Sequence, residues 1–254
     1  MKDNQITLSK LILLFLCLLI AGCQTFVSKE ETETIQEPWE KLSLDKKIAQ
    51  MIMFRLKGDI TNETTFEYKQ FHRWINELGI GGAVVYGGGL EETFNRIQIA
   101  QSWSEIPLFI AADYERGLGQ WYDGATLFPT NMAVAATGRN ILAYEQGIIT
   151  AKEAKAFGVN MIFAPVMDVN NNPDNPIINF RSYGDDPRMV SIFGNSFIRG
   201  VQDQNIYACV KHFPGHGNTA TDSHTRLPII PGNKRDFSKI ELPPFKSSVK
   251  NGVK

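Results

Sequence analysis

From Leu42 onward, short runs of apolar residues alternate with stretches in which apolar positions recur at helical spacing. The apolar runs predict strands near residues 51–56, 81–86, 107–113, 160–169 and 206–213. The helical pattern is clearest over residues 91–104, 140–158 and 186–204. Because the strand runs are apolar on both faces and helices separate them, the pattern is typical of a parallel sheet with helices packed outside it.

Two α/β architectures fit such a pattern, a closed (β/α)₈ barrel and an open doubly wound sheet. Asp113, Asp168 and the pair Lys211–His212 lie at or just beyond the carboxyl ends of the predicted strands, where barrel enzymes assemble their sites. The Gly-rich stretch at 85–94, "VYGGGLEETF", lacks the Lys-Ser/Thr pair of a phosphate-binding P-loop. We therefore expect an α/β, (β/α)₈ TIM-barrel-like fold, truncated after about five of its eight strands.

The N-terminus has the pattern of a signal peptide, with Lys2 and Lys10 before the apolar run "LILLFLCLLIAGC" at 11–23. Its end, "LIAGC", resembles the lipobox of bacterial lipoproteins, which implies cleavage before Cys23 and a lipid on that cysteine. A transmembrane anchor is the alternative, but the run is shorter than the about 20 residues that span a bilayer. The expected segments are a signal peptide (1–23), a flexible tether (24–38) and a folded domain (39–254).

The charge balance gives no electrostatic reason to expect nucleic acid as a partner. The chain of 254 residues has 26 Lys and Arg against 27 Asp and Glu. A lipid on Cys23 would hold the protein to a membrane of the bacterial cell envelope. Removal of the signal and lipidation of Cys23 would leave Cys209 as the remaining free cysteine, so we expect no disulfide.

Three of the four histidines lie in one stretch, "KHFPGHGNTATDSHTRLP", at residues 211–228. A histidine cluster indicates proton transfer, metal binding or polar substrate binding, because the imidazole pKa lies near neutral pH. A metal site would use His212, His216, Asp222 and His224, but neither a HExxH helix nor a Cys pair accompanies them. We therefore expect no metal and no organic cofactor.

This stretch, with "APVMDVNNNPDNPIINFRSYGDDP" at 164–187 and "AADYERG" at 111–117, resembles glycoside hydrolase family 3. The resemblance runs from about Trp39 to the end, and it implies a barrel domain that hydrolyses β-linked sugars with retention of configuration. The element "DSH" at 222–224 is similar to the β-N-acetylglucosaminidase (β-N-acetylhexosaminidase) branch. That branch implies removal of terminal β-linked N-acetylglucosamine from peptidoglycan fragments or chito-oligosaccharides.

The resemblance also implies roles for single residues. His224 would be the acid/base, since an imidazole can hold and release a proton near neutral pH. Asp222 would accept a hydrogen bond from that ring and support its protonated form. The matching positions imply four sugar contacts, namely Asp113, Arg181, Lys211 and His212. We expect His216 to shape its own loop.

The chain departs from the family pattern at two places. Trp121 falls where many members have an arginine that contacts the sugar, and we expect Arg116 or Arg181 to compensate. Retaining hydrolysis also needs a carboxylate nucleophile. Asp236 and Glu241 lie in a polar connection rather than at a strand end, so the family position of the nucleophile would follow Lys254.

Two other functions remain open at this point. One is a β-glucosidase-type hydrolase of the same family, which the "DSH" element disfavours. The other is a noncatalytic sugar-binding lipoprotein, which gains weight because no nucleophile is visible in the sequence.

Overall fold

The computed structural model describes residues 38–231 and 233–254. The predicted signal peptide, most of the predicted tether and Cys23 lie outside these residues. The chain divides into two compact units, one ending at Leu42 and one running from Ser43 to Lys254. The described part of the first unit contains one short 3-10 helix, η1 (Pro38–Lys41).

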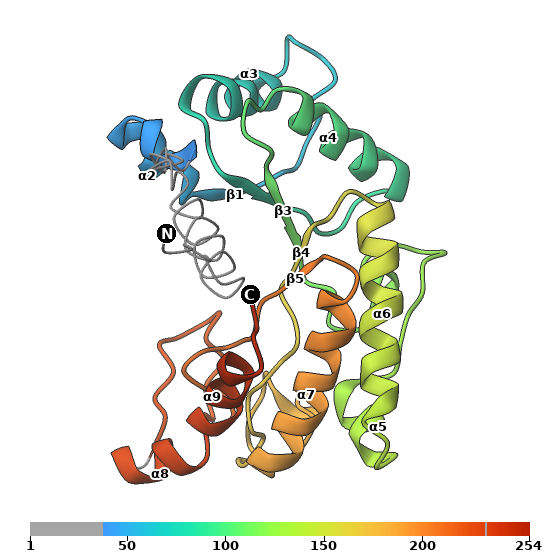
Figure 1. The fold of residues 1–254 in the computed structure, drawn as a ribbon, viewed down its shortest axis with the longest axis vertical. Coiled ribbons are helices and arrows are strands. Elements are labelled where there is room, and N and C mark those ends of the chain that lie inside the picture. Colours follow the sequence, from blue (N-terminus) through green and yellow to red (C-terminus); the bar gives the residue numbers. More distant parts are fainter. Residues whose placement is uncertain (1–37, 232) are drawn as a thin grey trace, which may run out of the picture. The chain divides into compact units, whose positions relative to one another are not determined.

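The second unit alternates strands and helices, as the apolar pattern predicts (Figure 1). Its elements are α2 (Leu44–Gln50), β1 (Met53–Arg55), α3 (Phe66–His72), the π-helical η2 (Arg73–Leu78), β2 (Gly82–Val84), α4 (Leu90–Ser102), β3 (Phe109–Ala112), η3 (Leu118–Gln120), α5 (Asn131–Ala136), α6 (Ile141–Ala156), β4 (Met161–Ile162), η4 (Asn179–Arg181), α7 (Pro187–Gln202), β5 (Tyr207–Ala208), α8 (Lys234–Lys239) and α9 (Leu242–Lys250).

The strands form one five-stranded parallel sheet in the order β1-β2-β3-β4-β5. Spatial order follows chain order, so right-handed crossovers place their helices on the same face of the sheet. Figure 1 shows α4, α6 and α7 beside the strands in this way. A doubly wound sheet would reverse direction and carry helices on both faces. The order is that of a barrel wall, and the sheet is not closed within the described residues.

Each predicted strand is confirmed, and each is shorter than its apolar run. In the run at 160–169, β4 ends at Ile162, and Pro165, which follows shortly, has no N–H to contribute to a ladder. Pairing resumes at one bridge between Val166 and Lys211, where Met167 N–H donates to the Lys211 carbonyl at 2.7 Å. This register places Lys211 beside the end of the β4 segment.

The helix boundaries follow from capping residues in the sequence. Asp186 precedes α7 and accepts a hydrogen bond from the Arg188 N–H at 2.9 Å, and Pro187 occupies the first turn. The buried face of α7 repeats at helical spacing through Val190, Phe193, Phe197 and Val201. An apolar stripe of this kind fixes which side of the helix meets the sheet.

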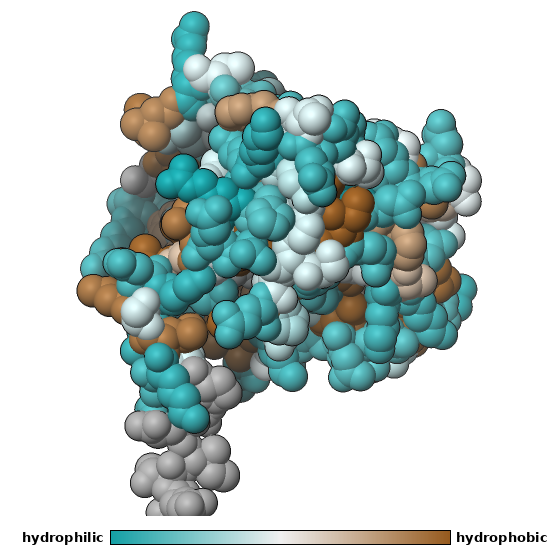
Figure 2. All heavy atoms as spheres, turned by 90° about the horizontal axis from the view of Figure 1, so that it is seen from above, coloured by the Kyte–Doolittle hydropathy of each residue, from teal (hydrophilic) through white to brown (hydrophobic). Residues whose placement is uncertain are grey.

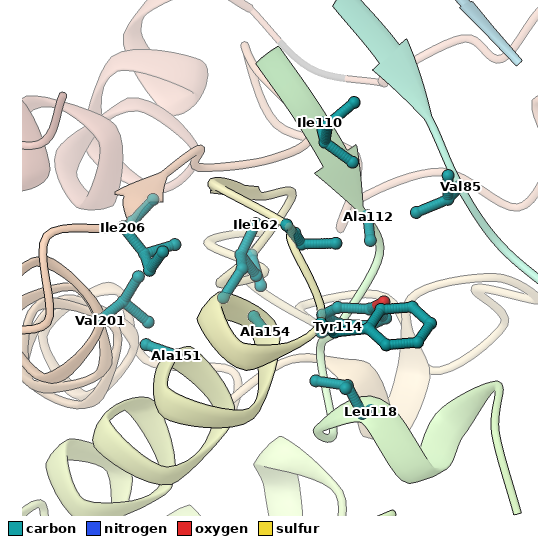
Figure 3. Close-up of a cluster of buried hydrophobic side chains, with 14 of the residues drawn as sticks. Val85, Ile110, Ala112, Tyr114, Leu118, Ala151, Ala154, Ile162, Val201 and Ile206 are labelled. Atoms are coloured by element: carbon teal, nitrogen blue, oxygen red, sulfur yellow. The ribbon is translucent and has the colours of Figure 1, made fainter. Parts of the chain in front are cut away.

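Small residues let α6 approach both the sheet and α7. Ala151 and Ala154 of α6 are fully buried and lie near Ile162 of β4 (Figure 3). On the side that meets α7, a side chain on Gly147 would place its Cβ 2.5 Å from the Phe197 carbonyl oxygen. The close approach of the two helices therefore requires glycine at this position.

Figure 2 shows one face, on which hydrophilic residues predominate and hydrophobic residues form separate groups. Within residues 38–231 and 233–254, no helix is both long and apolar enough to cross a membrane.

Candidate active site

A pocket of about 540 Å³ opens where segments following the strands converge. Tyr86 follows β2, Asp113 and Glu115 follow β3, and Lys211 and His212 follow β5. The remaining lining residues are Arg116, Gln120, Trp121, Ile177, Phe180, Arg181, His216, Ser223 and His224. The pocket thus lies at the carboxyl ends of the strands, where barrel enzymes place their sites.

The buried carboxylate of Glu115 is the electrostatic centre of the pocket. Arg181 Nε and Nη2 donate to its two oxygens at 3.0 and 2.7 Å, and Lys211 Nζ lies 2.7 Å from Oε1. Burial by itself raises the pKa of Glu115, but the hydrogen bonds and charges of Arg181 and Lys211 outweigh burial and lower the pKa to about 2. Glu115 is therefore a permanent anion at neutral pH.

Asp113 shares Lys211 with Glu115, and Lys211 Nζ also donates to Asp113 Oδ1. The Asp113 side chain is 35 % exposed, and its Oδ2 accepts no hydrogen bond from any described residue. The Trp121 indole N–H donates to the Asp113 carbonyl at 2.9 Å and fixes the wall beside it. Asp113 therefore presents one free carboxylate oxygen to the pocket.

Asp168 fixes the segment that follows β5. It is fully buried, and its Oδ2 lies 2.6 Å from His212 Nδ1. Its Oδ1 accepts from the His216 N–H at 2.7 Å, and both oxygens accept from the His212 N–H. Because a carboxylate only accepts, Nδ1 of His212 carries a proton. In the neutral ring Nε2 is then an acceptor, and it faces Arg181 Nη2 at 3.3 Å.

The two pocket arginines differ in how many donors they have free. Arg181 uses its N–H groups on Glu115, the Ile177 carbonyl and His212. Arg116 donates from Nε to the Phe128 carbonyl at 3.2 Å, and its terminal nitrogens have no partner in the described part of the chain. Arg116 is thus the pocket arginine with free donors.

Aromatic rings form a further wall of the pocket. The rings of Tyr86 and Trp121 have centroids 5.5 Å apart, and the guanidinium of Arg55 lies 4.0 Å from the centre of the Tyr86 ring. The Arg55 contact holds Tyr86 by a cation–π interaction. The ion pairs of Asp113, Glu115, Arg181 and Lys211 form the charged floor of the pocket. An aromatic wall beside this charged floor suits a ligand with one apolar and one polar face.

The predicted dyad lies at the edge of the pocket and is far more exposed than the charged floor. His224 Nδ1 lies 2.8 Å from Asp222 Oδ1, which also accepts the His224 N–H at 2.8 Å. Hydrogen bonds from the His224 backbone and ring lower the pKa of Asp222. The His224 side chain is 74 % exposed. With Nδ1 held by Asp222, Nε2 of His224 is available for proton exchange.

The histidines of this stretch form separate pairs with carboxylates. His212 and Asp168 bond to each other, while His224 bonds to Asp222. Among the residues that the structure describes, no three His, Cys, Asp or Glu side chains gather closely enough to hold a metal ion.

Comparison with known protein families assigns the chain to a family. The model of the glycosyl hydrolase family 3 N-terminal domain matches residues 43–254. The chain belongs to this family. The match begins at the residue where the second compact unit begins.

Relatives within family 3 carry hexosaminidase names. Beta-hexosaminidase A of Pseudoalteromonas piscicida is 34% identical over 230 residues, which cover 85% of this chain and 38% of the relative. A Cellulomonas fimi protein named beta-N-acetylglucosaminidase/beta-glucosidase is 30% identical over 70% of this chain and 31% of its own. The chain therefore spans less than half the length of these relatives.

A solved structure supports the fold. The family 3 beta-N-acetylglucosaminidase from a Paenibacillus species aligns with a TM-score of 0.76 at 35% identity, over 84% of this chain and 41% of the other. The barrel-like α/β prediction is confirmed, with five parallel strands in an unclosed sheet in the described part of the chain.

The structure brings all four predicted sugar-binding residues into one network. Arg181 and Lys211 both bond to Glu115, Lys211 also bonds to Asp113, and His212 faces Arg181. Asp222 and His224 pair with each other at the edge of the pocket. The roles that the family resemblance implies for these residues stay predictions.

Sequence reasoning missed two carboxylates of the site. Glu115 lies in the quoted "AADYERG" motif two residues after Asp113, and both residues line the pocket. Asp168 lies near the end of the predicted strand at 160–169, and the motif gives it no role. A carboxylate at or shortly after the end of an apolar run is the available signal for both residues, because burial there requires partners.

Asp236 and Glu241 lie in a helical segment and not at a strand end. Asp236 lies in α8, and Glu241 directly precedes α9. Burial raises the pKa of Glu241, whose residue surface is only 2 % exposed. Neither carboxylate lines the pocket.

We predict that Glu115→Gln destabilises the fold in a pH-dependent manner. The folded-state pKa of about 2 lies below the ordinary 4.5, so ionised Glu115 stabilises the fold above about pH 4.5 and this contribution is lost as the pH falls toward 2. A shift of this size corresponds to roughly 3 kcal/mol. Urea unfolding of both proteins at several pH values, followed by tryptophan fluorescence, measures the difference.

The exposed Glu105 provides the matched control. Glu105→Gln should shift the free energy of unfolding little at any pH. A loss in Glu115→Gln that is the same at about pH 6 and about pH 3 would contradict the proposed charge network.

Proposed function

We propose that this domain belongs to an exo-glycosidase that removes terminal β-linked N-acetylglucosamine, a β-N-acetylhexosaminidase. The observation that carries the proposal is the His224–Asp222 hydrogen bond of 2.8 Å beside a pocket with an ordered charged floor. The names of the Pseudoalteromonas and Paenibacillus relatives support the same substrate. Peptidoglycan fragments and chito-oligosaccharides both carry the required terminal sugar.

The sugar is bound by donors and acceptors that no other described group uses. The free Oδ2 of Asp113 accepts a hydrogen bond from a sugar hydroxyl, and the terminal N–H groups of Arg116 donate to sugar oxygens. Trp121 and Tyr86 cover the apolar face of the ring. Arg181 acts mainly by holding Glu115 and His212 in place, because most of its donors are already bonded.

His224 serves as the acid/base. Its Nε2 gives a proton to the leaving oxygen and later takes one from water, while Asp222 stabilises the protonated ring. Retention requires a carboxylate nucleophile. Glu115 does not suit that role, because cations bond both of its oxygens.

A β-glucosidase is the second candidate, because the Cellulomonas relative is named for both activities. A noncatalytic sugar-binding role would retain the charged floor but make no use of His224. Substrate preference separates the two enzymes, and turnover separates either enzyme from a binding protein.

We predict that the full-length protein cleaves 4-nitrophenyl β-N-acetylglucosaminide with a kcat/KM at least about tenfold above that for the β-glucoside, a difference of about 1.4 kcal/mol in transition-state binding. Initial rates over a range of substrate concentrations measure both constants. The reverse preference would favour the glucosidase, and binding of N-acetylglucosamine without turnover would favour the binding protein.

We predict that His224→Ala slows glycosides with poor leaving groups by about 10² to 10⁴ and activated aryl glycosides much less. An activated leaving group departs without a proton, whereas a sugar needs one. Asp222→Asn should show a weaker form of the same pattern. His72→Ala, on α3 and outside the lining of the pocket, is the matched histidine control and should leave both rates nearly unchanged. Equal losses for both substrate classes would remove the acid/base role from His224.

We also propose that a lipid on Cys23 anchors the protein in the bacterial cell envelope. The support is the sequence "LIAGC" after a short apolar run. Labelling of cells with a fatty-acid analogue should mark the wild-type protein, and Cys23→Ser should abolish the mark. Cys209→Ser is the matched control and should keep it. Equal labelling of wild type and Cys23→Ser would overturn the anchor.

A further inference from the structure

Asn175 is a buried side chain whose four hydrogen bonds join two segments beside the pocket. The residue is 2 % exposed and lies in the loop between β4 and η4. Its Oδ1 accepts from the Ile177 and Ile178 N–H groups at 2.9 and 2.7 Å. Its Nδ2 donates to the His216 and Gly217 carbonyls, at 2.8 Å each. Both donors and both lone pairs of the amide group are therefore bonded within the protein.

The Oδ1 side of Asn175 connects to the charged floor of the pocket. The Ile177 carbonyl accepts from Arg181 Nη1 at 3.0 Å, and the Ile178 carbonyl accepts from the Arg181 N–H at 2.8 Å. Arg181 in turn donates to both oxygens of Glu115. The turn that Asn175 closes is thus the turn that holds Arg181 against the floor.

The Nδ2 side of Asn175 connects to the loop that carries the predicted acid/base pair. His216 and Gly217 are buried, and no other described group donates to their carbonyl oxygens. A buried carbonyl that loses its donor costs free energy. The Asn175 amide therefore fixes the base of this loop.

The acid/base pair itself lies on an exposed stretch. The His224 side chain is 74 % exposed, and residues 223–227 are all exposed. Between Gly217 and the pair, Thr219 is fully buried, and its Oγ1 accepts from the Thr221 N–H at 3.1 Å. The position of the His224 ring therefore depends on how firmly the buried base of the loop is held.

We propose that Asn175 is a positioning residue for the acid/base, which couples the turn of Arg181 to the base of the His224 loop. The inference rests on the proposed function, since it concerns the placement of the proposed general acid. The floor binds the sugar and the loop supplies the proton, so the reaction needs a constant distance between the two. A displacement of about 1 Å between reacting groups can cost about a hundredfold in rate. One amide bonded to both segments fixes that distance.

Asn175→Asp separates the two sides of the amide. The carboxylate keeps an acceptor for the Ile177 and Ile178 N–H groups, but it places an oxygen without a hydrogen against the His216 and Gly217 carbonyls. In the full-length protein we expect kcat for N,N′-diacetylchitobiose to fall about tenfold or more, and kcat for 4-nitrophenyl β-N-acetylglucosaminide to fall less than about threefold. Both KM values should change little, because the turn of Arg181 keeps its hydrogen bonds.

A purely structural defect would not produce this difference. Loss of folded protein lowers the rates for both substrates by the same factor, because only the sugar leaving group needs the proton. Asn131→Asp is the matched control, since Asn131 is also 2 % exposed and its Nδ2 donates to the Arg181 carbonyl at 2.7 Å. Any loss in Asn131→Asp should be equal for the two substrates. Equal losses in Asn175→Asp would overturn the inference.

A double variant tests whether Asn175 acts through His224. Once His224→Ala has removed the proton donor, the placement of the loop no longer matters, so the addition of Asn175→Asp should slow diacetylchitobiose hydrolysis no further. Strictly additive losses would contradict the proposal. If Asn175→Asp does not fold, Asn175→Ser, whose smaller side chain leaves room for a water between the segments, is compared in the same way.

The same measurements distinguish this inference from the proposed function. Equal losses on both substrates in His224→Ala would remove the acid/base role and this inference with it. A leaving-group-dependent loss in His224→Ala, together with equal losses in Asn175→Asp, would overturn this inference alone.

Discussion

The site depends on one buried anion, the carboxylate of Glu115. It lies at the end of the β3 segment and binds two cations from distant parts of the chain, Arg181 after the β4 segment and Lys211 after β5. Removing one partner of a buried ion pair is costly, because the remaining charge is left in a poorly polar surrounding. The three segments are therefore held together by a group that has no free oxygen for chemistry.

Asp168 fixes the segment after β5 through hydrogen bonds, as Glu115 fixes the charged floor of the pocket through ion pairs. Its carboxylate binds the backbone of His212 and His216 as well as the His212 ring. Gly217 lies so close to the segment after β4 that a Cβ would sit 1.7 Å from the Val169 carbonyl oxygen. Residues 215–217 are buried, whereas residues 223–227 are exposed. A charged pocket floor therefore lies beside the more exposed Asp222–His224 pair.

The sequence predicts the strands and their parallel arrangement well, because a run such as 206–213 is apolar on both faces. It overestimates their length, since β5 has two residues and β4 stops before Pro165. An apolar run indicates which residues are buried, and residues remain buried beyond the last hydrogen bond between the strands. The sequence also identifies which residues gather at the strand ends, because the carboxyl ends of parallel strands meet on one side.

The sequence does not predict which polar atoms of that cluster bond to other protein groups and which remain free. Asp113 and Glu115 are two residues apart in one motif, yet Asp113 keeps a free oxygen and Glu115 has none. The sequence likewise does not distinguish Arg116 from Arg181 as a sugar contact. The structure shows that the N–H groups of Arg181 donate to other protein groups, whereas the terminal nitrogens of Arg116 have no partner in the described part of the chain. Which polar atoms remain unpaired depends on three-dimensional partners far apart in the chain. The groups left free after that accounting are the ones available to a ligand.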